Sequence, residues 1–60
     1  MTLTILNFDD GKVYQQDMTK EPNWLDQWQS EEYEDYITDK GFNLSNIEWM
    51  ISKYKYIENI

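Results

Sequence analysis

The side chains with the most evident chemistry in this 60-residue chain are carboxylates, concentrated in the segment SEEYEDYITDKGF. Glu31, Glu32, Glu34 and Asp35 fall close together there, and Asp39 follows one helical turn later. Carboxylates can transfer protons, bind hard cations or attract a basic surface. The first two uses need carboxylates that converge in a pocket, so the elements that carry these residues decide which use is open.

Absent residue types narrow the chemistry further. The chain has no histidine, which removes the commonest general base and the commonest transition-metal ligand. It also has no cysteine, so disulfide frameworks and thiolate zinc sites are excluded. Asp9 and Asp10 lack the spaced oxygen ligands of an EF-hand loop, and a turn is the simpler interpretation. We therefore expect no catalytic residue, no cofactor and no bound metal.

The charge of the chain bears on its partners. Twelve acidic residues oppose five lysines and no arginine, for a formal net charge of -7. Phosphate contacts need a basic footprint, so direct binding to nucleic acid or to an anionic membrane is not expected. The segment MTLTILNFDDGK lacks the positive flank of a signal peptide, and no run of 18 apolar residues occurs. We expect the protein in the cytoplasm.

Two β-prone runs surround Asp10 and Gly11, a pair that suits a two-residue type I′ turn. They predict a hairpin over about 2–17, with strands at about 2–8 and 12–17. A lone hairpin is marginal in water, so one of its faces should pack on helices.

Apolar side chains fall on both faces of this hairpin. Leu6 and Val13 lie on one face, and Ile5 and Tyr14 lie on the other. So small a domain buries little surface, and the second apolar face should therefore have a partner. We expect a homodimer at micromolar concentration, with the exposed edge of strand 2–8 or the outer sheet face in the contact.

Apolar spacing after the hairpin predicts helices. Pro22 suits a first helical turn, and Trp24, Leu25 and Trp28 recur at one-turn spacing. A helix over about 22–29 should place both indoles in the core. The sequence leaves open whether this helix is continuous with the acidic segment that follows.

The acidic segment itself predicts an amphipathic helix over 31–39. Ser30 can cap its start, and Gly41 can end it in the left-handed conformation. At 100° per residue the five carboxylates occupy an arc of roughly 160°, opposite three apolar or aromatic residues, Tyr33, Tyr36 and Ile37. The face carries one sign of charge, whereas a solvated face usually mixes signs. A binding surface and a solubility feature are both consistent with it.

A third helix is predicted over about 46–57, because Ser45 and Glu48 match the S-x-x-E capping box. Its core side would carry Ile47, Met50, Ile51, Tyr54 and Ile57. Trp49 and Tyr56 would lie on the opposite side, either filling space between helices or forming an exposed aromatic patch. The whole chain then forms one α+β domain, an N-terminal β-hairpin followed by two or three short helices packed on it.

The leading functional hypothesis is an inhibitor that occupies the basic groove of a nucleic-acid-binding or nucleic-acid-processing protein. Its expected contact residues are the five helical carboxylates, which give about one charge per 2.5 Å against about one per 1.7 Å for duplex DNA. In size, charge and architecture the chain is similar to the small DNA-mimic proteins of phages and mobile elements, which include anti-restriction, anti-CRISPR and uracil-DNA glycosylase inhibitor proteins. The alternative is a small adaptor that binds its partner through Trp49 and Tyr56.

Overall fold

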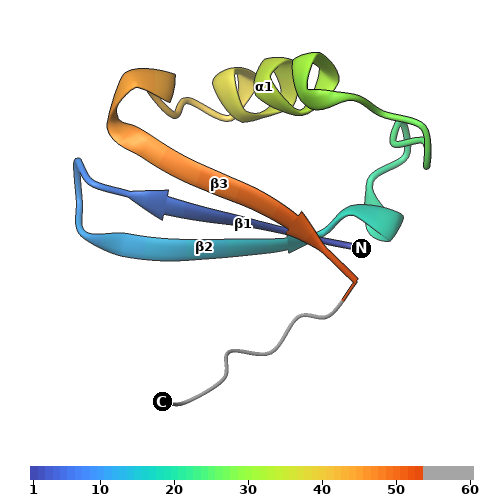
Figure 1. The fold of residues 1–60 in the computed structure, drawn as a ribbon, viewed down its shortest axis with the longest axis horizontal. Helices are drawn as coiled ribbons and strands as arrows, with labels where there is room; N and C mark the ends of the chain where they lie inside the picture. Colours follow the sequence, from blue (N-terminus) through green and yellow to red (C-terminus); the bar gives the residue numbers. More distant parts are fainter. Residues whose placement is uncertain (54–60) are drawn as a thin grey trace.

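The computed structural model describes residues 1–53, which form a three-stranded antiparallel sheet with one α-helix lying over one of its faces (Figure 1). The α-helix, α1, is longer than either of two 3-10 turns, η1 and η2. The elements follow in the order β1 Thr2–Asn7, β2 Lys12–Asp17, η1 Met18–Lys20, α1 Ser30–Asp39, η2 Leu44–Asn46 and β3 Ile47–Ser52.

The predicted hairpin is present, but its turn is longer than a two-residue turn. Asn7 pairs with Lys12, so residues 8–11 form the connection. Asn7 fixes this loop, because its carbonyl accepts the Gly11 N–H at 2.8 Å and its side-chain oxygen accepts the Asp9 N–H at 3.0 Å. Gly11 has a φ of 70°, which glycine adopts without strain. The predicted two-residue turn would pair Phe8 with Val13, whereas Leu6 pairs with Val13 in the structure. The shift is two residues, so each side chain keeps its predicted face.

The sheet order is β2-β1-β3, which makes β1 the central strand. The prediction that strand 2–8 has an exposed edge is therefore wrong, since β1 pairs with β2 on one side and β3 on the other. Opposite Ile5 lie Tyr14 in β2 and Trp49 in β3, so these three side chains share the face toward α1.

The helix predicted over 46–57 is also wrong within the described residues, because Ile47–Ser52 forms β3. The segment IEWMIS satisfies both a helical and an alternating pattern, and the three residues at every second position are β-branched or aromatic. Those three pack toward the core, namely Ile47, Trp49 and Ile51. Met50, which the helical pattern placed in the core, is 57% exposed on the other face. Tyr54 and Ile57 lie outside the described residues.

The S-x-x-E pattern before β3 does not act as a helix cap. Asn43 caps the short turn η2 instead, with its side-chain oxygen accepting the Ser45 N–H at 3.0 Å. The chain then enters β3 at Ile47 in an extended conformation. One turn of 3-10 helix thus satisfies the local hydrogen bonds, and pairing with β1 engages the backbone groups on one side of the strand that follows.

Residues 22–29 form turns and irregular segments, so the helix predicted there is wrong as well. The predicted burial of the two indoles is confirmed in part, since Trp24 and Trp28 are half-buried and pack against the core. Trp24 donates its indole N–H to the hydroxyl of Tyr33 at 2.9 Å. The prediction of two or three helices packed on the hairpin is therefore wrong. Residues 1–53 contain one α-helix, α1, preceded by an irregular segment whose two tryptophans pack against the core.

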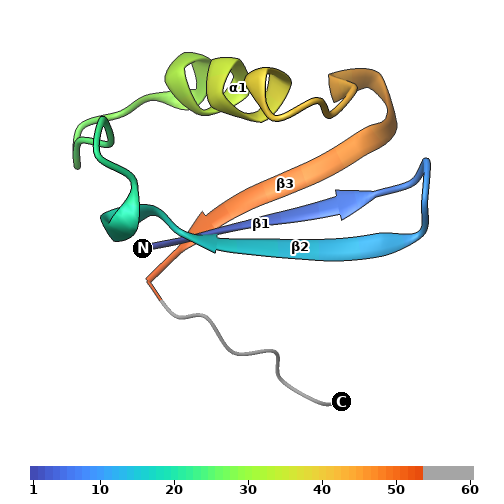
Figure 2. The same cartoon turned by 180° about the vertical axis from the view of Figure 1, so that it is seen from behind.

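The core lies between α1 and one face of the sheet. Both views of the ribbon place α1 and the segment leading to it on that side (Figures 1 and 2). The buried apolar side chains come from β1, η1, α1 and β3, and are Leu3, Ile5, Met18, Tyr33, Ile37 and Ile47. No helix within residues 1–53 is long and apolar enough to cross a membrane.

Candidate binding surface

The acidic helix predicted over 31–39 is present as α1, Ser30–Asp39, and begins one residue earlier. Gln29, not Ser30, is its N-cap, and the Glu32 carboxylate accepts the Gln29 backbone N–H at 2.6 Å. Acidic groups in the first turn interact favourably with the helix dipole. Gly41 follows the last turn with a φ of 97°, as its predicted role as a helix terminator requires.

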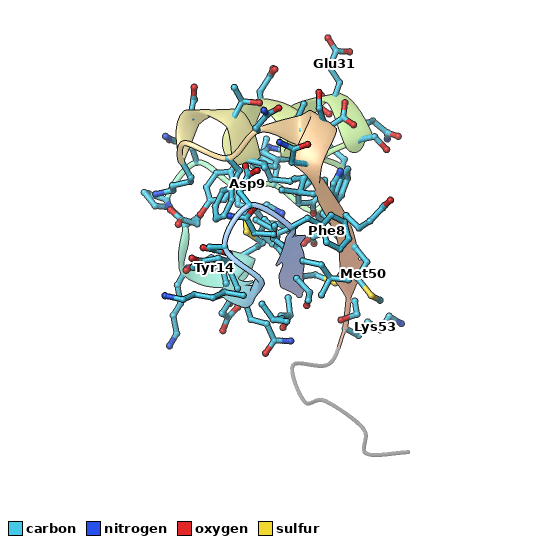
Figure 3. All side chains as sticks on the ribbon, turned by 90° about the vertical axis from the view of Figure 1, so that its left-hand side faces the viewer. Phe8, Asp9, Tyr14, Glu31, Met50 and Lys53 are labelled. Carbon is cyan, nitrogen blue, oxygen red and sulfur yellow. The ribbon has the colours of Figure 1, made fainter. Side chains whose placement is uncertain are left out.

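The five predicted carboxylates all lie on the outside of α1. Tyr33 and Ile37 anchor the helix to the sheet, and Ile37 is 0% exposed. Glu31 points away from the sheet at the top of the molecule (Figure 3). The exposed acids are Glu31, Glu32, Glu34, Asp35 and Asp39. The structure therefore brings together all five in one surface, which we call the acidic helix face.

Aromatic contacts and hydrogen bonds hold this face in place. The ring of Trp28 meets the ring of Tyr33 edge-on at 5.4 Å between centroids, and it lies 6.2 Å from the ring of Tyr36. Tyr36 donates its hydroxyl hydrogen to Glu21 at 2.5 Å. Burial, together with this hydrogen bond to a carboxylate, raises the pKa of Tyr36 well above its usual range. These contacts tie α1 to the segment that precedes it, so the side of the helix that carries the carboxylates is the side turned away from the sheet.

The acidic helix face receives no countercharge from its own helix. The last turn of α1 contains no basic residue. Lys40 follows directly, but its ammonium lies over the ring of Tyr36, 5.3 Å from the centroid. That cation–π contact directs Lys40 toward the side of the helix. Like-charged neighbours on α1 are therefore exposed to solvent and to any basic partner.

A second acidic group lies at the hairpin loop. Asp10 accepts hydrogen bonds from the Lys12 N–H at 2.9 Å and from the hydroxyl of Tyr14. The bond from Tyr14 lowers the pKa of Asp10 below its ordinary value, with smaller contributions from Lys12. Asp9 accepts a bond from the Asn46 side chain at 2.9 Å, which ties the loop to the turn before β3. Both residues thus serve the turn, and no cluster of three metal-ligating side chains occurs within residues 1–53.

The predicted aromatic pair is not formed by a helix. Trp49 lies in β3, half-buried, with its ring 5.7 Å from that of Tyr33. Its neighbours are core residues, so the described part of the chain gives the adaptor hypothesis little support. Tyr56 lies outside the described residues.

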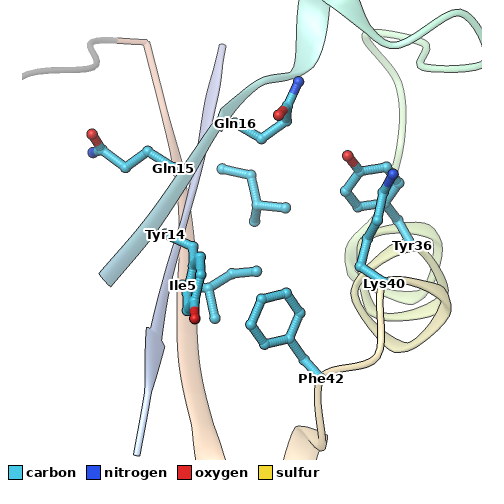
Figure 4. A pocket seen from close by; sticks show the side chains of 8 residues that line it. Ile5, Tyr14, Gln15, Gln16, Tyr36, Lys40 and Phe42 are labelled. Atoms are coloured by element: carbon cyan, nitrogen blue, oxygen red, sulfur yellow. The ribbon is translucent and has the colours of Figure 1, made fainter. Parts of the chain in front are cut away.

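Sequence reasoning missed a groove of about 310 Å³ between β2 and α1 (Figure 4). Leu3 and Ile5 of β1 line it, and Phe42 projects into it. Tyr14, Gln15, Gln16, Tyr36 and Lys40 complete its lining. The groove has no carboxylate among its lining residues. Such a groove depends on strand pairing and helix placement, for which the sequence gives no local signal.

The sequence also predicted an apolar outer face of the sheet, and left open whether that face or a strand edge makes a contact. Leu6 and Val13 oppose each other there and are 42% and 52% exposed, and Met50 lies on the same face. We call this surface the bare sheet face, because no other helix or strand of residues 1–53 covers it. Phe8, at the start of the loop, extends its apolar character.

The chain matches no protein-family model, and neither a curated protein nor a solved structure shows significant similarity to it. The geometry of the acidic helix face and of the bare sheet face is therefore the basis on which function is proposed.

Proposed function

We propose that this protein binds the basic groove of a nucleic-acid-binding or nucleic-acid-processing protein and thereby excludes the nucleic acid. One observation carries the proposal: five exposed carboxylates share one face of α1, and no basic residue lies within that helix. A folded array of carboxylates is complementary to a groove lined with lysine and arginine. The proposal places the protein in the cytoplasm, together with such a target.

The arrangement of the carboxylates supports this use over simple solubility. Four pairs at helical spacings of three or four residues repel each other, namely 31/34, 32/35, 31/35 and 35/39. Together they should destabilise α1 by on the order of 1 to 2 kcal/mol at low salt. A small domain has little stability to spare. A basic partner would relieve this repulsion, which would favour the complex.

The anchoring of α1 by its two tyrosines also supports the proposal. Trp24, Trp28 and Glu21 hold the two tyrosines of α1 from the preceding segment. Fixed charges lose less conformational entropy on binding than charges on a disordered tail. A preorganised face therefore suits competition with a stiff duplex.

The test is capture followed by displacement. The immobilised protein is exposed to cell lysate, and short duplex DNA is then used to elute whatever it retains. The expected result is retention of proteins with basic nucleic-acid sites, their release by DNA, and weaker retention as salt rises, because screening acts over about 8 to 10 Å near physiological ionic strength. Retained proteins that DNA does not displace would contradict the proposal, as would a mobility shift of bare duplex DNA by the purified protein.

A pair of matched variants links the result to the acidic helix face. Glu34→Gln with Asp35→Asn removes two charges from α1, whereas Glu48→Gln with Asp26→Asn makes the same chemical change at exposed sites elsewhere. We expect the α1 variant to associate with the captured protein several-fold more slowly, since complementary charges act mainly on association rate. Equal association rates for the two variants would assign the carboxylates to solubility alone.

A further inference from the structure

The outer edge of β3 carries backbone groups that no strand within residues 1–53 engages. Phe8 donates its N–H to the Asn46 carbonyl at 2.9 Å, in the same register that pairs Asn7 with Ile47. Hydrogen-bonded pairs alternate along an antiparallel ladder, so even-numbered residues of β3 direct their backbone groups toward β1. The odd-numbered residues therefore direct theirs outward, namely Ile47, Trp49 and Ile51.

The two edges of the sheet differ in how well they are protected. The β2 edge carries Lys12 and is otherwise rich in glutamine, and polar or charged side chains discourage strand addition. The β3 edge contains no lysine and no proline, and its sequence IEWMIS favours strand formation. The β3 edge is the more receptive of the two.

The bare sheet face adds an apolar surface beside this edge. Met50 of β3 is 57% exposed, and a shallow hollow of about 180 Å³ lies next to it. Leu6, Thr4, Glu48 and Trp49 share the lining of that hollow with Met50. A strand added to β3 would bring its own side chains against this hollow.

We propose that the occupant is β3 of a second copy, paired antiparallel about a two-fold axis at Met50. The two sheets would then form one six-stranded sheet, with both α1 helices on the same face and both bare sheet faces on the other. This dimer is independent of any nucleic-acid-binding partner.

Side-chain pairing selects this register among those that oppose outward-directed backbone groups. An axis at Trp49 would set the charged Glu48 against the partner's apolar Met50, and an axis at Ile51 would set Met50 against the polar Ser52 of the partner subunit. A two-fold axis at Glu48 would place two carboxylates opposite each other, which is unfavourable. An axis at Met50 instead places Met50 opposite the partner's Met50 and Glu48 opposite the partner's Ser52. The area is small, and such interfaces are weak, so we expect dissociation in the micromolar range.

Analytical ultracentrifugation of the full chain over a concentration series tests the dimer. The wild-type mass should approach twice the 7.4 kDa of one chain as concentration rises. Met50→Lys should raise the dissociation constant about tenfold or more, because like charges would meet at the axis. Val13→Lys is the matched control: its exposure is similar, its charge change is identical, and it lies on β2. That variant should change the constant by less than about threefold.

Two further measurements separate pairing at β3 from other effects of Met50→Lys. An equimolar mixture of Met50→Lys and Met50→Glu chains should regain dimerisation, since opposite charges would then meet at the axis. A synthetic chain with an N-methyl group on the Trp49 amide keeps every side chain but blocks the outer edge, and it should remain monomeric. N-methylation of the Gln15 amide, outward on β2, should leave the dimer intact.

Circular dichroism confirms that each variant is folded. A wild-type chain that stays at 7.4 kDa throughout would overturn the proposal. So would a Val13→Lys chain as defective as Met50→Lys, a charge-swapped mixture that fails to associate, or an N-methyl-Trp49 chain that still dimerises.

Discussion

The two faces of the sheet carry apolar residues from the same strands, but those residues are buried on one face and exposed on the other. On one face, Leu3 and Ile5 of β1 are buried beneath α1. On the other face, Leu6 of β1 is 42% exposed, with Val13 beside it. The sequence TLTILN places apolar residues on both sides of the strand, so hydrophobicity alone does not determine which side the helix covers.

Charge differs between the two sides as strongly as burial does. The layer above the covered face ends in the carboxylates of α1, and the bare sheet face is lined mainly by apolar and neutral polar side chains. The molecule is thus polarised, with an electrostatic surface on one side and an apolar surface on the other. Two kinds of contact, one sensitive to salt and one based on burial, can therefore operate without competing.

The largest effect on stability should come from truncating an apolar residue beneath α1, compared with the same kind of truncation on the bare sheet face. Ile37→Ala removes a side chain with 0% exposure and should lower the free energy of unfolding by about 3 to 4 kcal/mol. Val13→Ala, at a site 52% exposed, should lower it by less than about 1 kcal/mol. Urea unfolding at low protein concentration, followed by tryptophan fluorescence, measures both. Equal losses would mean that the two faces are not as different as their exposure indicates.

The second largest loss of stability should come from a substitution in the connection between α1 and β3. Gly41 has a φ of 97° and no atom within 4 Å of an added Cβ, so Gly41→Ala strains only the backbone. We expect a loss of about 1 to 2 kcal/mol in thermal unfolding. A D-alanine at this position accepts positive φ and should cause no such loss. If L- and D-alanine behave alike, backbone conformation does not govern this joint.

The hydrogen bond between Tyr36 and Glu21 should contribute less, about 1 kcal/mol at neutral pH. The pKa of Tyr36 is raised in the folded state, so this stabilisation is complete below about pH 10 and declines as pH rises further. Tyr36→Phe should flatten the loss of stability between about pH 9 and 11, as measured by urea unfolding. Tyr14→Phe removes a hydroxyl that is likewise bonded to a carboxylate, that of Asp10, but at an exposed site, so it should change the pH profile less. A wild-type profile unchanged by Tyr36→Phe would exclude this linkage.

The smallest effect should come from the outermost charges. Glu34→Gln with Asp35→Asn removes one partner from each of the four repelling pairs and should raise the free energy of unfolding by about 0.8 kcal/mol or more at low salt, which is about 0.2 kcal/mol or more for each pair. The gain should shrink in high salt. Glu48→Gln with Asp26→Asn, measured by the same urea unfolding, should show no comparable gain. A loss of stability in the α1 variant would show that its carboxylates are already satisfied within the monomer.

The parts of the fold that could be predicted have local causes. The hairpin follows from two β-prone runs around a turn sequence, and α1 follows from the segregation of acids from Tyr33, Tyr36 and Ile37 over consecutive turns. The five carboxylates of the candidate surface were predicted for the same reason, since a helix face is set by sequence spacing alone.

The parts that could not be predicted depend on distant partners. The apolar spacing of residues 47–52 fits both a helix and a strand. The segment forms a strand because it pairs with the free edge of β1. Trp24 and Trp28 have helical spacing, but they reach Tyr33 from an irregular segment. The groove between β2 and α1 and the open edge of β3 are likewise products of strand order, which no short stretch of sequence encodes.

The sheet order also sets a sequence of events in time. The central strand is made first, yet its second neighbour, β3, is made last, so the ladder from Thr2–Ser52 to Asn7–Ile47 closes almost the whole described chain. Contacts between residues so far apart slow folding, because loop closure must precede the contacts that offset its entropy. Until Ile47–Ser52 has left the ribosome, β1 and β2 form only a hairpin with an unpaired edge. A nascent chain that stops before β3 would therefore carry the carboxylates of α1 without the platform that arranges them.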